Sequence, residues 1–293
     1  MKKTLLIPLI LIAAIFAACL FFLQDKEKTV IKYFPLDEKV SFSSYNTELK
    51  ILSETDTDEY DIRWEEHSEL ESPIYLRQDV SLLYVDGRLK GILSKWKENG
   101  QTIEQKSSIH GEDSSHFQAI TFHHGELHYP DDKIKSIQAM SADELYVIDS
   151  PHTALESFDQ PLNKEQEEWK QTLDTATNQQ LSFHWNQLIN HFGVPVDNYT
   201  IVPLTDLVKF QDQPVPGLTE KQSQQVIGQL WEGLYKNYIL GIAGNQDNKH
   251  PINTFIPLLL FANDGSHLMV LYQNEKEEKQ QLLQAYPSFS DNR

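Results

Sequence analysis

The feature that most limits how this chain can fold is an uncharged run near its beginning. Residues Leu5 to Leu23 contain no charged side chain, and Lys2 and Lys3 precede them. At about 1.5 Å per residue, a helix of this length is just long enough to cross the hydrocarbon core of a membrane. Because basic residues favour the cytoplasmic side, we expect residues 5–23 to lie in the cell membrane. The bulk of the chain would then be extracytoplasmic, anchored at its N-terminus.

Two fates are open for this segment. Small residues stand directly before Cys19, and this pattern resembles a bacterial lipobox, in which Cys19 would be lipidated after cleavage. However, Leu20 to Leu23 continue the apolar run past the cysteine, which favours an uncleaved signal anchor. Residues 1–23 are therefore predicted to be a signal anchor or a lipoprotein signal peptide, and residues 24–29 a short charged stem.

The charge of the chain narrows the range of partners. It carries 43 acidic and 25 basic residues, for a net charge of -18. A surface this negative disfavours nucleic acid and is compatible with divalent cations or basic partners. Cys19 is the only cysteine, which excludes a disulfide framework. A chain of 293 residues is long enough to bury a core without one.

Residues 30–160 have the alternating pattern of antiparallel strands. Asp86-Gly87 separates two alternating runs and predicts a tight hairpin turn. In the acidic stretch 54–71, apolar side chains recur at every second position from Tyr60, which indicates an edge or surface strand. We therefore expect a β-rich region built as an antiparallel meander of about five to eight strands.

After residue 160 the pattern changes to a helical period. Two successive segments have apolar residues at helical spacing and are predicted to be separate helices. Thr219 and Gln222 have the spacing of a capping box, at the start of a longer helix whose apolar stripe includes Trp231. Asn263 to Gly265 then predict a β-hairpin near the C-terminus.

Runs of strands followed by runs of helices indicate an α+β fold. Residues 30–160 would form a β-rich extracytoplasmic region with the antiparallel β-meander. Residues 161–293 would form a helix-rich α+β region with helices and a C-terminal β-hairpin. The two regions would belong to one domain or to two small domains, behind one N-terminal membrane helix.

Five histidines lie close together in the sequence, between residues 110 and 128. Imidazoles and carboxylates bind Zn²⁺ and other divalent cations, and nearby imidazoles can also transfer protons. On an extended strand, alternate residues of this segment would point to the same side. The candidate metal ligands are His110, His116, His123, His124, His128 and Glu126. The alternative is that they are polar side chains on an acidic surface, since the sequence contains no His-Glu-x-x-His pattern.

Other standard signatures are missing from the sequence: it contains no Gly-x-Ser-x-Gly, no P-loop and no Gly-x-Gly-x-x-Gly. No cofactor is firmly implied, and Zn²⁺ or another divalent cation is the candidate. We therefore expect a membrane-tethered, non-catalytic binding or regulatory module of the cell envelope, in contact with an envelope protein, a peptide or a small ligand. The alternative function is a divalent-metal-binding protein or a metal-dependent enzyme that uses the segment from His110 to His128.

Overall fold

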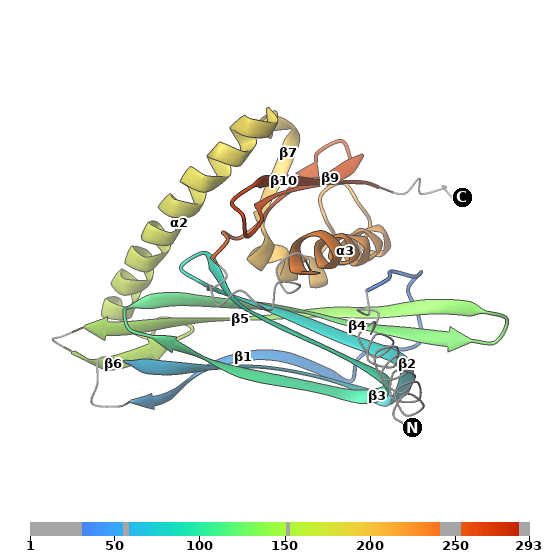
Figure 1. Ribbon diagram of the computed structural model, residues 1–293, viewed down its shortest axis with the longest axis horizontal. Coiled ribbons are helices and arrows are strands. Elements are labelled where there is room, and N and C mark those ends of the chain that lie inside the picture. The colour runs from blue at the N-terminus through green and yellow to red at the C-terminus, as the bar shows by residue number, and fades with distance from the viewer. Residues whose placement is uncertain (1–30, 55–58, 151–152, 241–252, 287–293) are drawn as a thin grey trace, which may run out of the picture. The chain divides into compact units, whose positions relative to one another are not determined.

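The computed structural model describes residues 31–54, 59–150, 153–240 and 253–286, and from Ile31 onward the chain forms one compact unit. The strands of its first half are β1 (Ser44–Glu54), β2 (Tyr60–Val85), β3 (Arg88–Gly111), β4 (Ser115–Tyr129), β5 (Lys133–Ser150) and β6 (Thr153–Phe158). The helical elements of the second half are α2 (Lys164–Phe192), η1 (Val196–Asn198), η2 (Leu204–Gln211), α3 (Glu220–Leu234) and η3 (Tyr235–Ile239). Its strands are β7 (Tyr199–Pro203), β8 (Leu258–Ala262), β9 (His267–Gln273) and β10 (Lys279–Ala285) (Figure 1).

Strands dominate this architecture. Among the described residues, 52% belong to strands and 26% to helices. The prediction of an α+β fold behind an N-terminal helix is therefore wrong, and the fold is mostly β. The difference arises because β2 and β3 extend to 26 and 24 residues, so the polar stretches within residues 60–111 are themselves paired as strands. The second half also adds a sheet of four strands.

Residues 5–23, predicted to cross the membrane, lie outside the described residues, as do Cys19 and the stem 24–29. Among the described helices, none is both long and apolar enough to span a bilayer. The longest of them, α2, has 29 residues but carries charged and polar side chains along its length. The prediction of a signal anchor at the membrane with an extracytoplasmic bulk therefore has no support in the structure and is not retained.

The first sheet is organised by the length of β2. Its first part, from Tyr60 to Glu69, pairs with both β1 and β3. Its later part, from Leu76 to Val85, pairs with both β3 and β4. The register with β3 shifts between Glu69 and Ile74, where β2 exchanges β1 for β4. The sheet continues through β5 and β6 and folds over itself, so that β1 lies across from β4 and β5 (Figure 1).

A core is enclosed between the two parts of this folded sheet. Alternate residues of β2 point into it, and Ile62 and Trp64 are almost fully buried there. The stretch 54–71, predicted to contain an edge or surface strand, thus contains the start of a central strand with one buried face. Across the core, Thr47 of β1 donates a hydrogen bond of 2.6 Å to Thr121 of β4, which ties the two parts together.

The second half of the chain covers the opposite face of β2, β4 and β5. Trp231 of α3 is fully buried and stacks on Phe122 of β4, with 5.0 Å between the ring centroids. The hydroxyl of Tyr238 lies 3.4 Å from that of Tyr84 on β2. Strands β7 to β10 form a second antiparallel sheet, and Figure 1 shows α3 between this sheet and the first one.

Several local predictions are confirmed. Asp86-Gly87 forms the turn between β2 and β3, with φ of 49° and 78°, a conformation that favours glycine. Thr219 and Gln222 form the capping box at the start of α3, and residues 263–265 connect β8 to β9. The two helices predicted after residue 160 are instead the single helix α2, which runs unbroken until Gly193 ends it with a φ of 62°.

Trp231→Ala should lower the free energy of unfolding by about 3–5 kcal/mol, because the substitution removes a buried ring and leaves a cavity. Urea denaturation would measure this loss. Trp96 is 44% exposed, and Trp96→Ala should change stability by no more than about 0.5 kcal/mol. A loss below about 1 kcal/mol for Trp231→Ala would show that α3 does not pack on the sheet as described.

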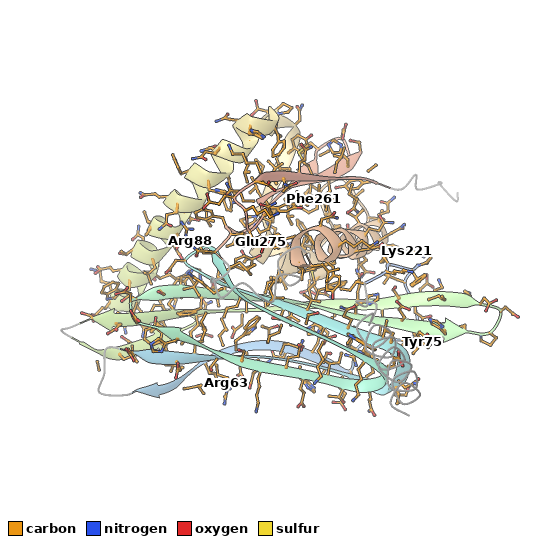
Figure 2. The ribbon with its side chains drawn as sticks, viewed as in Figure 1. Arg63, Tyr75, Arg88, Lys221, Phe261 and Glu275 are labelled. Carbon is orange, nitrogen blue, oxygen red and sulfur yellow. The ribbon has the colours of Figure 1, made fainter. Side chains whose placement is uncertain are left out.

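A second prediction concerns His184 of α2, which stacks on Phe255 at 4.3 Å. The guanidinium of Arg88 lies 4.0 Å from the centroid of the same ring; Arg88 is the first residue of β3 and is labelled in Figure 2. Burial, and then the charge of Arg88, lower the pKa of His184 to about 4. Below about pH 6.5 the unfolded chain therefore binds a proton that the folded chain excludes, so stability should fall as the pH drops from about 6.5 to about 4.

His184→Gln should remove up to about 3 kcal/mol of this acid-induced loss. Urea denaturation between about pH 7 and pH 4.5 would measure the slope for each protein. His191→Gln changes an exposed histidine on the same helix and serves as the control. Its unfolding free energy should depend on pH with the same slope as that of the parent protein. Equal slopes for all three proteins would contradict the burial of His184.

Candidate functional site

A polar cleft opens where the outer face of β4 and β5 meets α2 and η2, and we call it the α2–β5 cleft. It consists of two adjoining hollows of about 270 and 460 Å³. Both are lined by Gln118 of β4, Glu144 of β5, and Thr205 and Asp206 of η2. The cleft therefore draws its side chains from segments that are far apart in the sequence.

His116 lies in the smaller hollow, where its side chain is 6% exposed. The pairing of β4 with β5 places it opposite Tyr146, and the two rings stack with 4.1 Å between centroids. Its Nε2 is 3.3 Å from Glu144 Oε2, and its Nδ1 is 3.6 Å from Asp174 Oδ1 on α2. Both ring nitrogens thus face a carboxylate, which fixes the orientation of the ring.

The wall of this hollow contains a linked set of side chains: Lys170, Asp174 and Tyr146. Lys170 and Asp174, one turn apart on α2, form an ion pair of 3.0 Å. The Tyr146 hydroxyl donates a hydrogen bond of 2.8 Å to Asp174 and accepts one from Lys170. The Lys170 ammonium also lies 4.2 Å from the centroid of the Tyr146 ring. The positive charge of Lys170 is therefore already engaged within the wall.

The carboxyl groups of the cleft have different environments. The hydrogen bond from His116 holds the pKa of Glu144 below its usual value. Burial raises the pKa of both Asp143 and Asp206. Asp143 accepts hydrogen bonds from the backbone N–H groups of Leu49 and Glu144. As a residue, Asp206 is exposed to solvent, and it has no hydrogen-bond or ion-pair partner among the described residues, so a ligand can reach its carboxyl.

The five candidate histidines do not meet at one point. Among the described residues, groups of His, Cys, Asp and Glu close enough to hold a metal ion occur twice, and each group contains a single histidine. The two groups are exposed Glu59, His110 and Glu112, and buried Glu66, Asp79 and His123. In both groups, the carboxylates beside the histidine lie outside the predicted set.

His124, Glu126 and His128 occupy alternate positions of β4, but they form no common site. His124 is buried, and its Nε2 lies 3.2 Å from the hydroxyl of Ser136. Glu126 and His128 form a pair of 3.5 Å. The ring of His128 stacks on Tyr75 at 3.6 Å. Figure 2 shows Tyr75 near the opposite end of the first sheet from Arg88.

His123 points to the opposite side of β4, into the enclosed core. Its Nδ1 lies 2.8 Å from Asp79 Oδ2, and its Nε2 lies 2.8 Å from the hydroxyl of Ser141. Glu66 Oε2 is 3.8 Å from the same Nδ1, and the other oxygen of Glu66 accepts a hydrogen bond of 2.8 Å from Gln105. Burial, and then the charge of Asp79, raise the pKa of Glu66 to about 8.

Arg77 brings a fixed positive charge to this buried cluster. Its Nη2 lies 3.7 Å from Asp79 Oδ1, and the hydroxyl of Ser68 bridges the two side chains. Its Nη1 donates a hydrogen bond of 2.6 Å to the carbonyl of Gln101, and the guanidinium lies 4.9 Å from the ring centroid of Phe42. Such partners are needed because an unpaired buried charge is strongly destabilising.

Sequence reasoning missed the partners of these histidines. Glu66 had a signal, because the alternation that starts at Tyr60 continues through Trp64 to Glu66 on the same face of β2. The carboxylates of the cleft had no such signal in the sequence. Asp174 and Asp206 lie in helical segments, and nothing in their local sequence relates them to β4.

Comparison with known proteins adds no family: neither a family model, nor a curated protein, nor a solved structure matches this chain. The inference of function therefore depends on the α2–β5 cleft and on the buried cluster of β2 and β4.

His116→Gln should raise the pKa of the Glu144 carboxyl toward its ordinary value, because the histidine hydrogen bond is the largest cause of its depression. Carbon-detected NMR titration of the side-chain carboxyls would measure the change. His110→Gln alters an exposed histidine elsewhere and should leave the Glu144 titration unchanged. A Glu144 pKa that is the same in both variants would exclude the His116–Glu144 contact.

Proposed function

We propose that the protein is a non-catalytic binding or regulatory module that holds a cationic segment of a peptide or protein partner in the α2–β5 cleft. The larger hollow, at 460 Å³, falls within the size range of sites that take ligands. Its walls come from both halves of the chain, so a bound segment would contact the first sheet and the helices together.

The charge of the cleft supports a cationic ligand. Five carboxyl groups line the two hollows, against two lysines, of which Lys170 is already paired. The five are Asp143, Glu144, Asp159, Asp174 and Asp206. The chain as a whole is also acidic, with a net charge of -18, so a basic partner would be attracted from a distance and then oriented in the cleft.

The observation that carries the proposal is the position of Asp206. Its carboxyl lines both hollows, beside Glu144, and has no partner among the described residues. The residue is exposed to solvent, and the charge of Lys209 already attracts its carboxylate. An incoming ammonium or guanidinium group would add a closer counter-charge and hydrogen bonds.

The state of His116 supports binding rather than acid–base chemistry. Both of its ring nitrogens face carboxylates, and one face of its ring is covered by Tyr146. A general base needs a nitrogen within hydrogen-bond reach of the substrate proton. The neighbouring carboxylates occupy these directions, so the histidine positions Glu144 in the wall of the site.

The proposal can be tested with a fluorescein-labelled tetralysine peptide, whose binding to the full chain is followed by fluorescence anisotropy at physiological salt. Asp206→Asn should weaken binding by about tenfold or more, because it removes a charge-assisted hydrogen bond while preserving the shape of the side chain. Thermal unfolding would verify that the variant remains folded.

The matched control is Glu104→Gln. Glu104 lies on β3, its side chain is 74% exposed, and the substitution changes the net charge by the same amount. Its effect on binding should be less than about twofold. Equal weakening by the two substitutions, or no binding by the parent protein, would contradict the proposal, because either result would leave no role for the cleft.

A further inference from the structure

The buried cluster on β2 and β4 has a composition and geometry that the cleft does not explain. Glu66, Asp79 and His123 are 2%, 0% and 0% exposed. One potential ligand atom from each lies within 4.8 Å of those from the other two. Two carboxylates and one imidazole form a ligand set that Zn²⁺ accepts.

Two oxygens of this cluster lack hydrogen bonds. Glu66 Oε2 and Asp79 Oδ1 are buried and have no hydrogen-bond donor among the described residues. Native proteins rarely leave such atoms unsatisfied, because the desolvation cost is then unrecovered. Glu66 Oε2 lies 3.8 Å from His123 Nδ1, whereas Asp79 Oδ1 lies 3.7 Å from Arg77 Nη2. Glu66 Oε2 is therefore the unsatisfied atom that points toward the histidine.

The charges point the same way. Asp79 and Glu66 are two acids in a dry core, and Arg77 supplies one positive charge, at 3.7 Å from Asp79. A cation would supply a second positive charge, which would allow both carboxyls to be ionised, and it would give Glu66 Oε2 a partner. The alternative is a proton that keeps Glu66 neutral.

The surroundings would also orient metal ligands. His123 has its other nitrogen, Nε2, at 2.8 Å from Ser141 Oγ, and Gln105 donates to the second oxygen of Glu66. Hydrogen bonds of this kind fix the tautomer of a ligating imidazole and the direction of a ligating carboxylate.

We propose that Glu66, Asp79 and His123 bind one Zn²⁺ ion, which links β2 to β4 inside the folded sheet. The three side chains are buried, so a bound ion would be withdrawn from solvent and would stabilise the folded sheet. This site is independent of the α2–β5 cleft. It uses one of the histidines predicted as a ligand, together with two carboxylates that the prediction did not include.

The test begins with the full chain, unfolded in denaturant with EDTA and refolded with or without micromolar Zn²⁺. After desalting, metal content is measured by inductively coupled plasma mass spectrometry, and stability by thermal unfolding. We expect about one zinc per chain and a higher melting temperature after refolding with zinc. A parent protein that retains no zinc and gains no stability would overturn the proposal and leave a shared proton in the cluster.

Substitutions locate the ion. Glu66→Gln keeps the side-chain shape and should abolish zinc retention, whereas Glu112→Gln, in the exposed group beside His110, should retain about one ion per chain. Ser141→Ala leaves all three ligands in place and should weaken zinc affinity by about 10–100-fold, which provides a test even if Glu66→Gln fails to fold. Full zinc retention by Glu66→Gln, or unchanged affinity in Ser141→Ala, would contradict the assignment.

Discussion

The strand β2 exchanges its neighbour β1 for β4 between Glu69 and Leu76, and most of the structure depends on this exchange. This strand of 26 residues keeps β3 on one edge throughout, while the twist that accumulates along a sheet carries its other edge from β1 to β4. The sheet therefore folds over, which encloses one face of β4 and β5 against β1. The other face remains available for the second half of the chain.

The two faces of β4 consequently have different chemistry. The outer face packs Phe122 against Trp231 and gives the apolar contact expected of a core. The enclosed face holds His123 with Asp79 and Glu66, beside an otherwise apolar cluster. Burying these groups costs desolvation, and the hydrogen bonds from Ser141 and Gln105 offset part of that cost. His123 and His124, although adjacent in the sequence, therefore lie in different environments.

The α2–β5 cleft arises at the boundary between the two halves. The helix α2 rises at an angle from one end of the first sheet (Figure 1). Near this end, Trp169 and Leu173 of α2 pack against the cluster of Tyr146 and Phe158, and Asp174 accepts a hydrogen bond from the Tyr146 hydroxyl. Where the apolar packing ends, Asp174, Glu144 and Asp206 face a common space. A binding site at such a junction would respond to any change in the packing of the two halves.

The sequence by itself determined the local events: the turn at Asp86-Gly87, the capping box of α3 and the hairpin before β9. These depend on backbone conformation and on hydrogen bonds between near neighbours. It also contained the alternation that buries Glu66. Only the tertiary structure decided that β2 would be central, that the fold would be mostly β, and that His116 and His123 would meet different carboxylates. Those outcomes depend on which strands pair and which faces meet, and such long-range choices leave no periodic signal in the segments concerned.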